Sequence, residues 1–265
     1  MDDLQDQITL LKKADSEIFY IISQEEEDVA VALFILNYEI AKIFASNSEK
    51  EIAKLRFSWW QEQIEAIFSN DIKTETPLLR LLVDIKEKYK LDFADFKVIL
   101  EAQSFNLNED KFKNESELKK FVEKTFFQNL LIIIKAKNIA LSRDAKVMLK
   151  KYSYMLKLTR IVNSLASKNY NIHPFITEDL IKSLASEKAY KRNEMAILKL
   201  KDKLKSLLNE CQYYNTESKF LNDFQLLVQF QSKNTIKYAD SRSEIVFSPL
   251  GFKLFKFLNL FKLNR

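Results

Sequence analysis

Polar side chains within apolar helical stretches are the first candidates for chemistry in this chain. Residues 33–44 are apolar except for a few positions, among them Asn37, Glu39 and Lys42, and Arg160 interrupts a second apolar pattern far along the chain. A buried acid and a buried base either pair with each other or with neighbours, which offsets their desolvation, or they line a polar pocket. Both interpretations stand for Glu39 and Arg160.

A guanidinium beside two indoles forms the second group of candidates. Arg56 lies one helical turn before the adjacent Trp59 and Trp60. An indole buries a large area while its N–H seeks a hydrogen-bond partner, so the two side chains suit either a packed core or the wall of a pocket. Aromatic residues at helical spacing mostly build core.

Several kinds of active site are excluded by composition. The chain has one glycine, so it can contain neither a phosphate-binding P-loop nor a dinucleotide-binding glycine motif. His173 is the only histidine and Cys211 the only cysteine, which rules out a Cys/His zinc site and an intramolecular disulfide. His173 precedes Pro174 in an expected loop, and Cys211 shows no motif of a reactive thiol. Any metal would be a hard cation bound by carboxylates.

The elements that position these residues are predicted to be helices throughout. With 47% hydrophobic residues, one glycine and three prolines among 265 residues, the composition favours an all-α fold. No long flexible linker interrupts the chain, so we predict a single domain over residues 1–265. Ser48 and Glu51 fit a capping box between two helices. We expect further helices at residues 78–89, 93–105, 142–168, 187–214, 220–230 and 249–263, and one after Asn114 or Ser116 that runs through residue 134.

Charge and hydropathy indicate where the protein acts. The net charge of +5 arises from 42 basic and 37 acidic residues interspersed along the helices, so we expect no nucleic-acid partner. The acidic N-terminal segment is unlike a secretory signal, and no apolar run reaches the ~18 residues of a spanning helix. We predict a cytoplasmic protein, with peripheral association to the inner face of the membrane as the alternative.

The helix expected at residues 249–263 is the candidate for that association. Lysines and an asparagine form a polar stripe, and apolar residues cover the rest of the surface. Such a helix either lies on an anionic membrane or packs on the bundle with its lysines outward. The predicted membrane-contact residues are Phe252, Phe255, Phe257 and Phe261.

The order of motifs resembles the squalene/phytoene synthase family. Residues 33–43, LFILNYEIAKI, resemble its L-(Y/F)-x-(F/L)-N-x-E-(I/L)-A-(K/R)-(I/V) segment, and residues 51–60, EIAKLRFSWW, its L-R-x-x-W-W segment. EAQSFNL at 101–107 is similar to E-A-R-R-F-D-L, and Ser248-Pro249-Leu250 to the C-terminal end. This resemblance covers nearly the whole chain. It implies an all-α, isoprenoid-synthase-like helical bundle with a central cavity.

The resemblance also implies a magnesium chemistry whose ligands this chain lacks. Active relatives place two D-x-x-x-D pairs on facing helices, where residues four apart share a face and hold Mg²⁺ against a diphosphate leaving group. The corresponding positions carry Ala41, Ala45, Ser164 and Lys168, and Asn106 replaces an aspartate of the F-D-L segment. We therefore predict no catalytic residue, no metal ligand and no cofactor.

The resemblance implies a non-enzymatic function. The branch of the family that keeps both helical segments and lacks the aspartates resembles assembly factors of respiratory complex I, which implies an assembly or scaffold factor for a membrane respiratory complex. The alternatives are a Mg²⁺-dependent prenyltransferase and a non-catalytic module that binds an isoprenoid. The predicted remnant of the pocket consists of Asn37, Glu39, Arg56, Trp59, Trp60, Asn106, Arg160 and Asn163.

Overall fold

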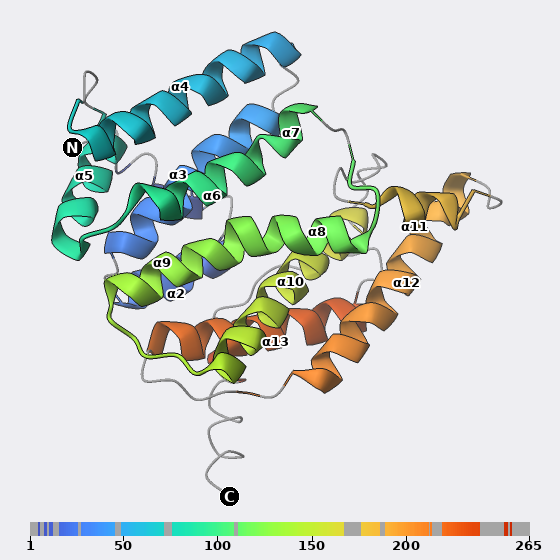
Figure 1. Ribbon diagram of the computed structural model, residues 1–265. Coiled ribbons are helices and arrows are strands. Elements are labelled where there is room, and N and C mark those ends of the chain that lie inside the picture. Colours follow the sequence, from blue (N-terminus) through green and yellow to red (C-terminus); the bar gives the residue numbers. More distant parts are fainter. Residues whose placement is uncertain are drawn as a thin grey trace, which may run out of the picture. The chain divides into compact units, whose positions relative to one another are not determined.

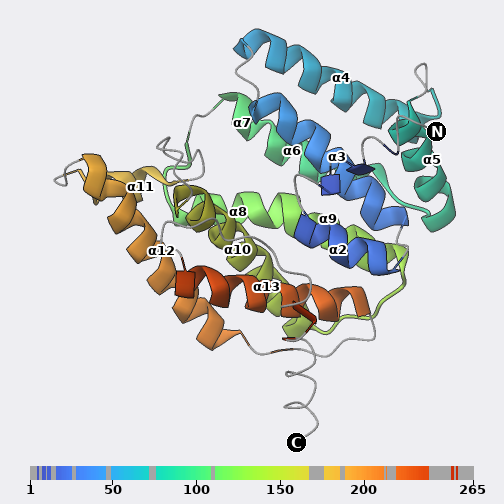
Figure 2. The same ribbon diagram turned by 180° about the vertical axis from the view of Figure 1, so that it is seen from behind.

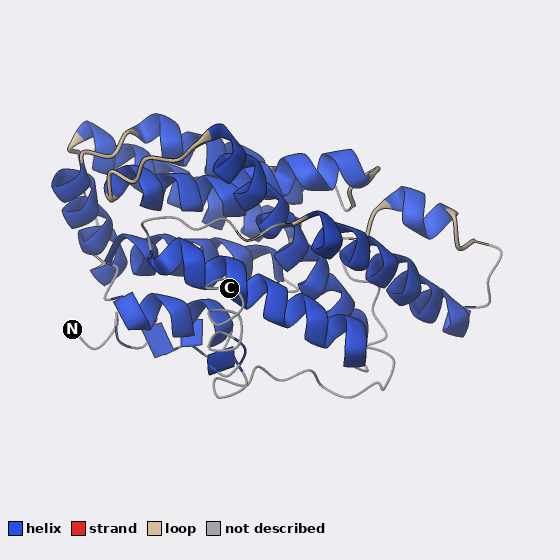
Figure 3. Ribbon diagram, turned by 90° about the horizontal axis from the view of Figure 1, so that it is seen from below, coloured by secondary structure: helices blue, strands red, loops and turns tan. Residues whose placement is uncertain are grey.

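The computed structural model is helical in the part of the chain that it describes, which contains no strand (Figure 3). The all-α prediction is therefore confirmed. The described residues are 5, 8–9, 11–12, 16–25, 28–45, 49–71, 76–108, 111–166, 176–185, 189–211, 213, 219–238, 252–253 and 255.

The chain divides into two compact units. The first contains residues 1–110 and 124–140, and the second contains residues 111–123 and 141–265. The predicted single domain over residues 1–265 stays a prediction. The first unit holds α2 (Ser16–Glu25), α3 (Asp28–Ala45), α4 (Lys50–Ser69), α5 (Pro77–Tyr89), α6 (Phe93–Gln103), α7 (Phe105–Asn108) and α9 (Gln128–Ala136). The second holds α8 (Glu115–Val122), α10 (Arg143–Ala166), α11 (Glu178–Lys182), α12 (Ala189–Glu210) and α13 (Lys219–Tyr238).

Helix α3 is the core of the first unit. It contacts α2, α4, α5 and α9, and α4 lies along it in Figure 1. Its side chains from Ala32 to Leu36 are almost completely buried, as the nearly uninterrupted apolar run predicts. Between α8 and α9 the chain forms a π-helical turn, Glu123–Phe127, which the sequence pattern does not reveal.

Side-chain caps set several helix starts. Thr76 accepts from the amide of Leu79 at 3.3 Å at the start of α5, and Asn114 accepts from the amide of Glu117 at 3.0 Å at the start of α8. The predicted capping box before α4 is wrong, because the N-cap lies one residue after Ser48. Glu49 is the N-cap of α4 and makes no side-chain cap hydrogen bond, while Ser48 lies outside the described residues.

Asp28 joins the start of α3 to the end of α5. Its carboxylate accepts from Lys88 Nζ at 2.6 Å, from the Tyr89 hydroxyl at 2.7 Å and from the Val29 amide at 2.8 Å. Burial alone would raise the pKa of Asp28, but these three donors outweigh it and hold the pKa below its usual value. The ionised carboxylate therefore stabilises the contact between the two helices.

Replacing this carboxylate is expected to destabilise the protein. We expect Asp28→Ala to lower the free energy of unfolding by about 1–2 kcal/mol, because three donors lose a partly exposed carboxylate acceptor. Since the folded pKa is depressed, this contribution is present above the ordinary pKa of Asp and is lost as the pH falls through the folded pKa. Urea unfolding at neutral and acidic pH measures both effects. Asp84→Ala, at an exposed site on α5, is the control and should change stability little.

The second unit is built around α10, which contacts α8, α12 and α13 (Figure 2). Polar pairs connect α10 to α13: the buried hydroxyls of Thr159 and Ser232 lie 3.0 Å apart, and the half-buried Gln229 donates to the hydroxyl of the buried Tyr152 at 2.6 Å. Buried hydroxyls need such partners because an unpaired one is costly. These pairs set the register in which the two helices pack.

Candidate functional site

Part of the predicted pocket assembles in the first unit, between α3 and α4. An open pocket of about 740 Å³ is lined by Glu39, Lys42 and Ile43 from α3 and by Leu55, Arg56, Trp59 and Trp60 from α4. The predicted candidates Glu39, Arg56, Trp59 and Trp60 therefore lie at one site. This grouping follows from the helical spacing of the two segments and the contact between α3 and α4.

The indoles of this pocket differ in burial. The Trp59 and Trp60 rings lie edge to face, 4.9 Å between centroids, with Trp60 buried and Trp59 half-buried. Arg56 is exposed, and Leu55 is 72% exposed. Trp60 thus serves the core, as aromatic spacing suggests, while Trp59, Arg56 and Leu55 present a surface.

Glu39 pairs with a neighbour on its own helix. Lys42 Nζ donates to its carboxylate at 3.0 Å and lies 5.3 Å from the centroid of the Tyr38 ring. Glu39 thus pairs with a nearby cation and also lines the pocket, so both interpretations of this acid remain predictions. Arg160 is half-buried on α10 in the second unit.

The other predicted pocket residues bond within their own helix, bond to a neighbouring helix, or lie outside the described side chains. Asn37 donates to the carbonyl of Leu33 at 2.9 Å, one turn back on α3. Asn163 accepts from the Thr235 hydroxyl at 2.7 Å and so belongs to the contact between α10 and α13. The side chain of Asn106 is not among those described.

The positions aligned with the family's aspartates are distributed over both units. Ala41 is exposed on α3 and Ala45 ends that helix, with its side chain outside those described. Ser164 is half-buried on α10, while Lys168 lies outside the described residues, as does His173. Within the described ranges, no three His, Cys, Asp or Glu side chains gather as a metal site would require.

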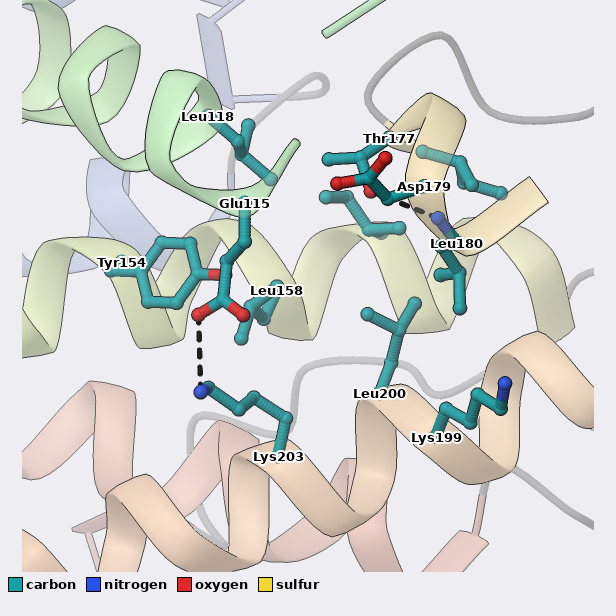
Figure 4. A pocket seen from close by; sticks show the side chains of 12 residues that line it. Glu115, Leu118, Tyr154, Leu158, Thr177, Asp179, Leu180, Lys199, Leu200 and Lys203 are labelled. Carbon is teal, nitrogen blue, oxygen red and sulfur yellow. Dashed lines mark hydrogen bonds and ion pairs between the residues drawn. The ribbon is translucent and has the colours of Figure 1, made fainter. Parts of the chain in front are cut away.

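A second pocket, which sequence reasoning missed, lies within the second unit (Figure 4). Its volume is about 370 Å³, and α8, α10, α11 and α12 supply its walls together with the residues just before α11. The lining residues are Glu115, Leu118, Tyr154, Leu158, Ile161, Ile176, Thr177, Asp179, Leu180, Lys199, Leu200 and Lys203.

A charged cluster forms one wall of this second pocket. Glu115 forms ion pairs with two lysines: its Oε1 lies 2.7 Å from Lys119 Nζ and 3.1 Å from Lys203 Nζ, the second contact being drawn in Figure 4. Burial raises the pKa of Glu115, but the two lysines outweigh it and hold the pKa below its usual value. Burial, together with the charge of Glu115, raises the pKa of Tyr154 well above its usual range. Glu115 is therefore ionised and the phenol neutral at physiological pH.

The amphipathic pattern of α12 explains why this pocket was missed. Lys199 and Lys203 alternate with other lysines on a helix whose charges read as solvated surface. Their spacing of four residues places them on one face. That spacing indicates a basic face on α12, but only the structure shows that this face lines a pocket with α8 and α11.

Two further predictions concern Cys211 and the C-terminal phenylalanines. Cys211 is buried, and burial raises its pKa to about 11, which keeps the thiol protonated and agrees with an inert residue. Phe252 is buried with its ring 5.8 Å from that of Phe230, and the half-buried Phe255 lies 5.4 Å from the same ring. Membrane contact by Phe252 is thus corrected to packing on α13. Phe257 and Phe261 lie outside the described residues.

None of the described helices combines the length and the apolar character that crossing a membrane would need.

Comparisons with known proteins give two kinds of similarity. The sequence model of the squalene/phytoene synthase family matches residues 11–128. The complex I assembly factor 6 proteins of Bos taurus and Homo sapiens are 26% identical over 121 residues, which is 44% of this chain. The match spans 36% of the length of these relatives.

Solved structures extend the similarity over the whole fold. A dehydrosqualene synthase crystallised with a ligand aligns with a TM-score of 0.73 at 12% identity, over 100% of this chain and 98% of its own. Squalene synthase HpnC from Alicyclobacillus acidocaldarius aligns with a TM-score of 0.57 at 10% identity, over 91% and 96% of the two chains. At these identities the likeness shows the fold alone. Together with the match over residues 11–128, it confirms that the chain has the helical isoprenoid-synthase fold and resembles the squalene/phytoene synthase family.

Proposed function

We propose that this protein is a catalytically degenerate relative of the squalene/phytoene synthases that acts as an assembly or scaffold factor for a membrane respiratory complex. One observation carries the proposal. The positions aligned with the magnesium-binding aspartates hold Ala41, Ala45, Ser164 and Lys168. Methyl groups, a hydroxyl and an ammonium cannot hold Mg²⁺ against a diphosphate, so the ionisation step has no electrostatic support. The similarity to complex I assembly factor 6 favours a respiratory complex as the partner.

The exposed side of α4 supplies a surface suited to a protein partner. We call Ile52, Leu55, Arg56 and Trp59 the α4 face; Ile52 is 41% exposed and Leu55 72% exposed. Tryptophan and arginine dominate the binding energy of protein interfaces, and a pocket beside them accepts an anchoring side chain. The pocket between α3 and α4 borders three of these residues: Leu55, Arg56 and Trp59.

The enzymatic alternative is tested by turnover. The full chain is incubated with farnesyl or geranylgeranyl diphosphate, with and without Mg²⁺, and diphosphate release is measured. We expect no release above the protein-free control, because the aspartate positions carry no carboxylate. Release that requires Mg²⁺ would refute the degenerate assignment. An isoprenoid that co-purifies with the protein, without diphosphate release, would instead favour the binding-module alternative.

The scaffold function is tested in the native cell. Deletion of the gene is expected to reduce NADH:ubiquinone oxidoreductase activity in isolated membranes, and the unaltered protein should restore it. A Leu55→Ala/Arg56→Ala variant should restore it poorly, because truncation of interface hot spots weakens binding by ~2 kcal/mol or more. Glu65→Ala, exposed on the same helix outside the pocket, is the matched control. Full activity after deletion would overturn the proposal.

A further inference from the structure

The pocket of the second unit has no part in the proposed docking surface on α4. Its interior is aliphatic, lined by Leu118, Leu158, Ile161, Ile176, Leu180 and Leu200. A water molecule takes ~30 Å³ in the liquid, so 370 Å³ admits roughly a dozen groups of that size. An unbranched chain of about ten carbons with a small head group matches this volume, which lies near the lower end of ligand pockets.

The charges at the pocket discriminate between head groups. Lys199 and Lys203 project from α12 one turn apart, and Glu115 and Asp179 also line the pocket. Glu115 is already matched by Lys119 and Lys203. Lys199 donates to the Ser183 hydroxyl at 2.8 Å, and a neutral hydroxyl is a partner that an anion displaces readily. Counting Lys119, three lysines surround two carboxylates, so an anionic head group is favoured over a cationic one.

We propose that this pocket binds a medium-chain fatty carboxylate. Its aliphatic chain lies between α10 and α11, against Leu158, Ile161 and Leu180, and its carboxylate accepts hydrogen bonds from Lys199 and Lys203. The site is built entirely within one unit and depends neither on a metal nor on the α4 face. It therefore stands independently of the proposed scaffold function.

Calorimetric titration of the full chain with decanoate, at concentrations well below micelle formation, tests the proposal. We expect saturable binding at one site. Decylamine is the probe of opposite charge and decanol the neutral one; both should bind at least about tenfold more weakly. Lys199→Glu should weaken decanoate binding by about tenfold or more, whereas Lys191→Glu makes the same charge change at an exposed site on α12 outside the pocket.

A second pair of variants tests the location of the aliphatic chain. Leu200→Trp places an indole at the half-buried pocket wall and should abolish binding, while Leu198→Trp, at a 47% exposed neighbouring site, should not. Circular dichroism melting establishes that both variants fold. Decanoate binding that survives Leu200→Trp in a folded protein, binding of decylamine as tight as that of decanoate, or uptake of many decanoate molecules per chain would overturn the assignment.

Discussion

Phe57→Ala is expected to lower the free energy of unfolding by about 3–5 kcal/mol, the range found when a large buried aromatic side chain is truncated. Phe57 is 1% exposed in the middle of α4, and its ring lies 5.6 Å from that of Phe44 on α3. The substitution removes this contact and leaves a cavity in the helix pair that carries the α4 face. Urea unfolding, followed by circular dichroism, measures the change.

Leu55→Ala is the matched comparison for that experiment. Leu55 is two residues away on the same helix and 72% exposed, so its truncation should change stability by less than ~0.5 kcal/mol. The two variants distinguish the two sides of α4. The side with Phe57 supports the fold, and the side with Leu55 is exposed and can bind a partner. Equal destabilisation by both substitutions would mean that Leu55 is covered, and it would remove the α4 face as a docking surface.

The helical composition made the fold class accessible from the sequence. The sequence predicted a helix start at Asn114 or Ser116, because a side-chain oxygen before an amphipathic run satisfies a free amide, and Asn114 makes that hydrogen bond. The aligned motifs predicted the family likeness because they preserve the apolar spacing that packs α3 on α4. Local chemistry determines these features, so one sequence suffices to find them.

The candidate site was accessible only in part. Glu39, Arg56, Trp59 and Trp60 lie on two consecutive helices, so their meeting follows from short-range connection. Asn163 was assigned to the pocket, yet its amide oxygen accepts from Thr235, 72 residues later. The periodicity of α10 identifies a buried side but does not name the helix that packs against it. The pocket around Glu115 and Lys203 was missed for the same reason, because its walls come from helices distant in sequence.

Lys157 shows a feature that apolar periodicity alone does not reveal. It is half-buried on α10, and burial, with a further contribution from the positive charge of Arg160, lowers its pKa to about 7. In the unfolded chain a lysine titrates near ~10.4. Between these two values the unfolded chain binds a proton that the folded chain does not, so the free energy of unfolding contributed by Lys157 rises with pH.

Lys157→Met is therefore expected to stabilise the protein below about pH 7 and to lose this advantage as the pH approaches ~10. A pKa difference of about three units corresponds to ~4 kcal/mol, and partial exposure of the side chain reduces the expected gain to about 2 kcal/mol. Urea unfolding at intervals between about pH 6 and 9 measures the difference between the variant and the unaltered protein.

Lys146→Met, at an exposed site on the same helix, should show no such trend. Titration of Cys211 is common to all three proteins and cancels in the comparison. A gain that does not change with pH would assign the effect to packing of the methionine. A gain confined to low pH would show that protonation of the half-buried Lys157 lowers the free energy of unfolding.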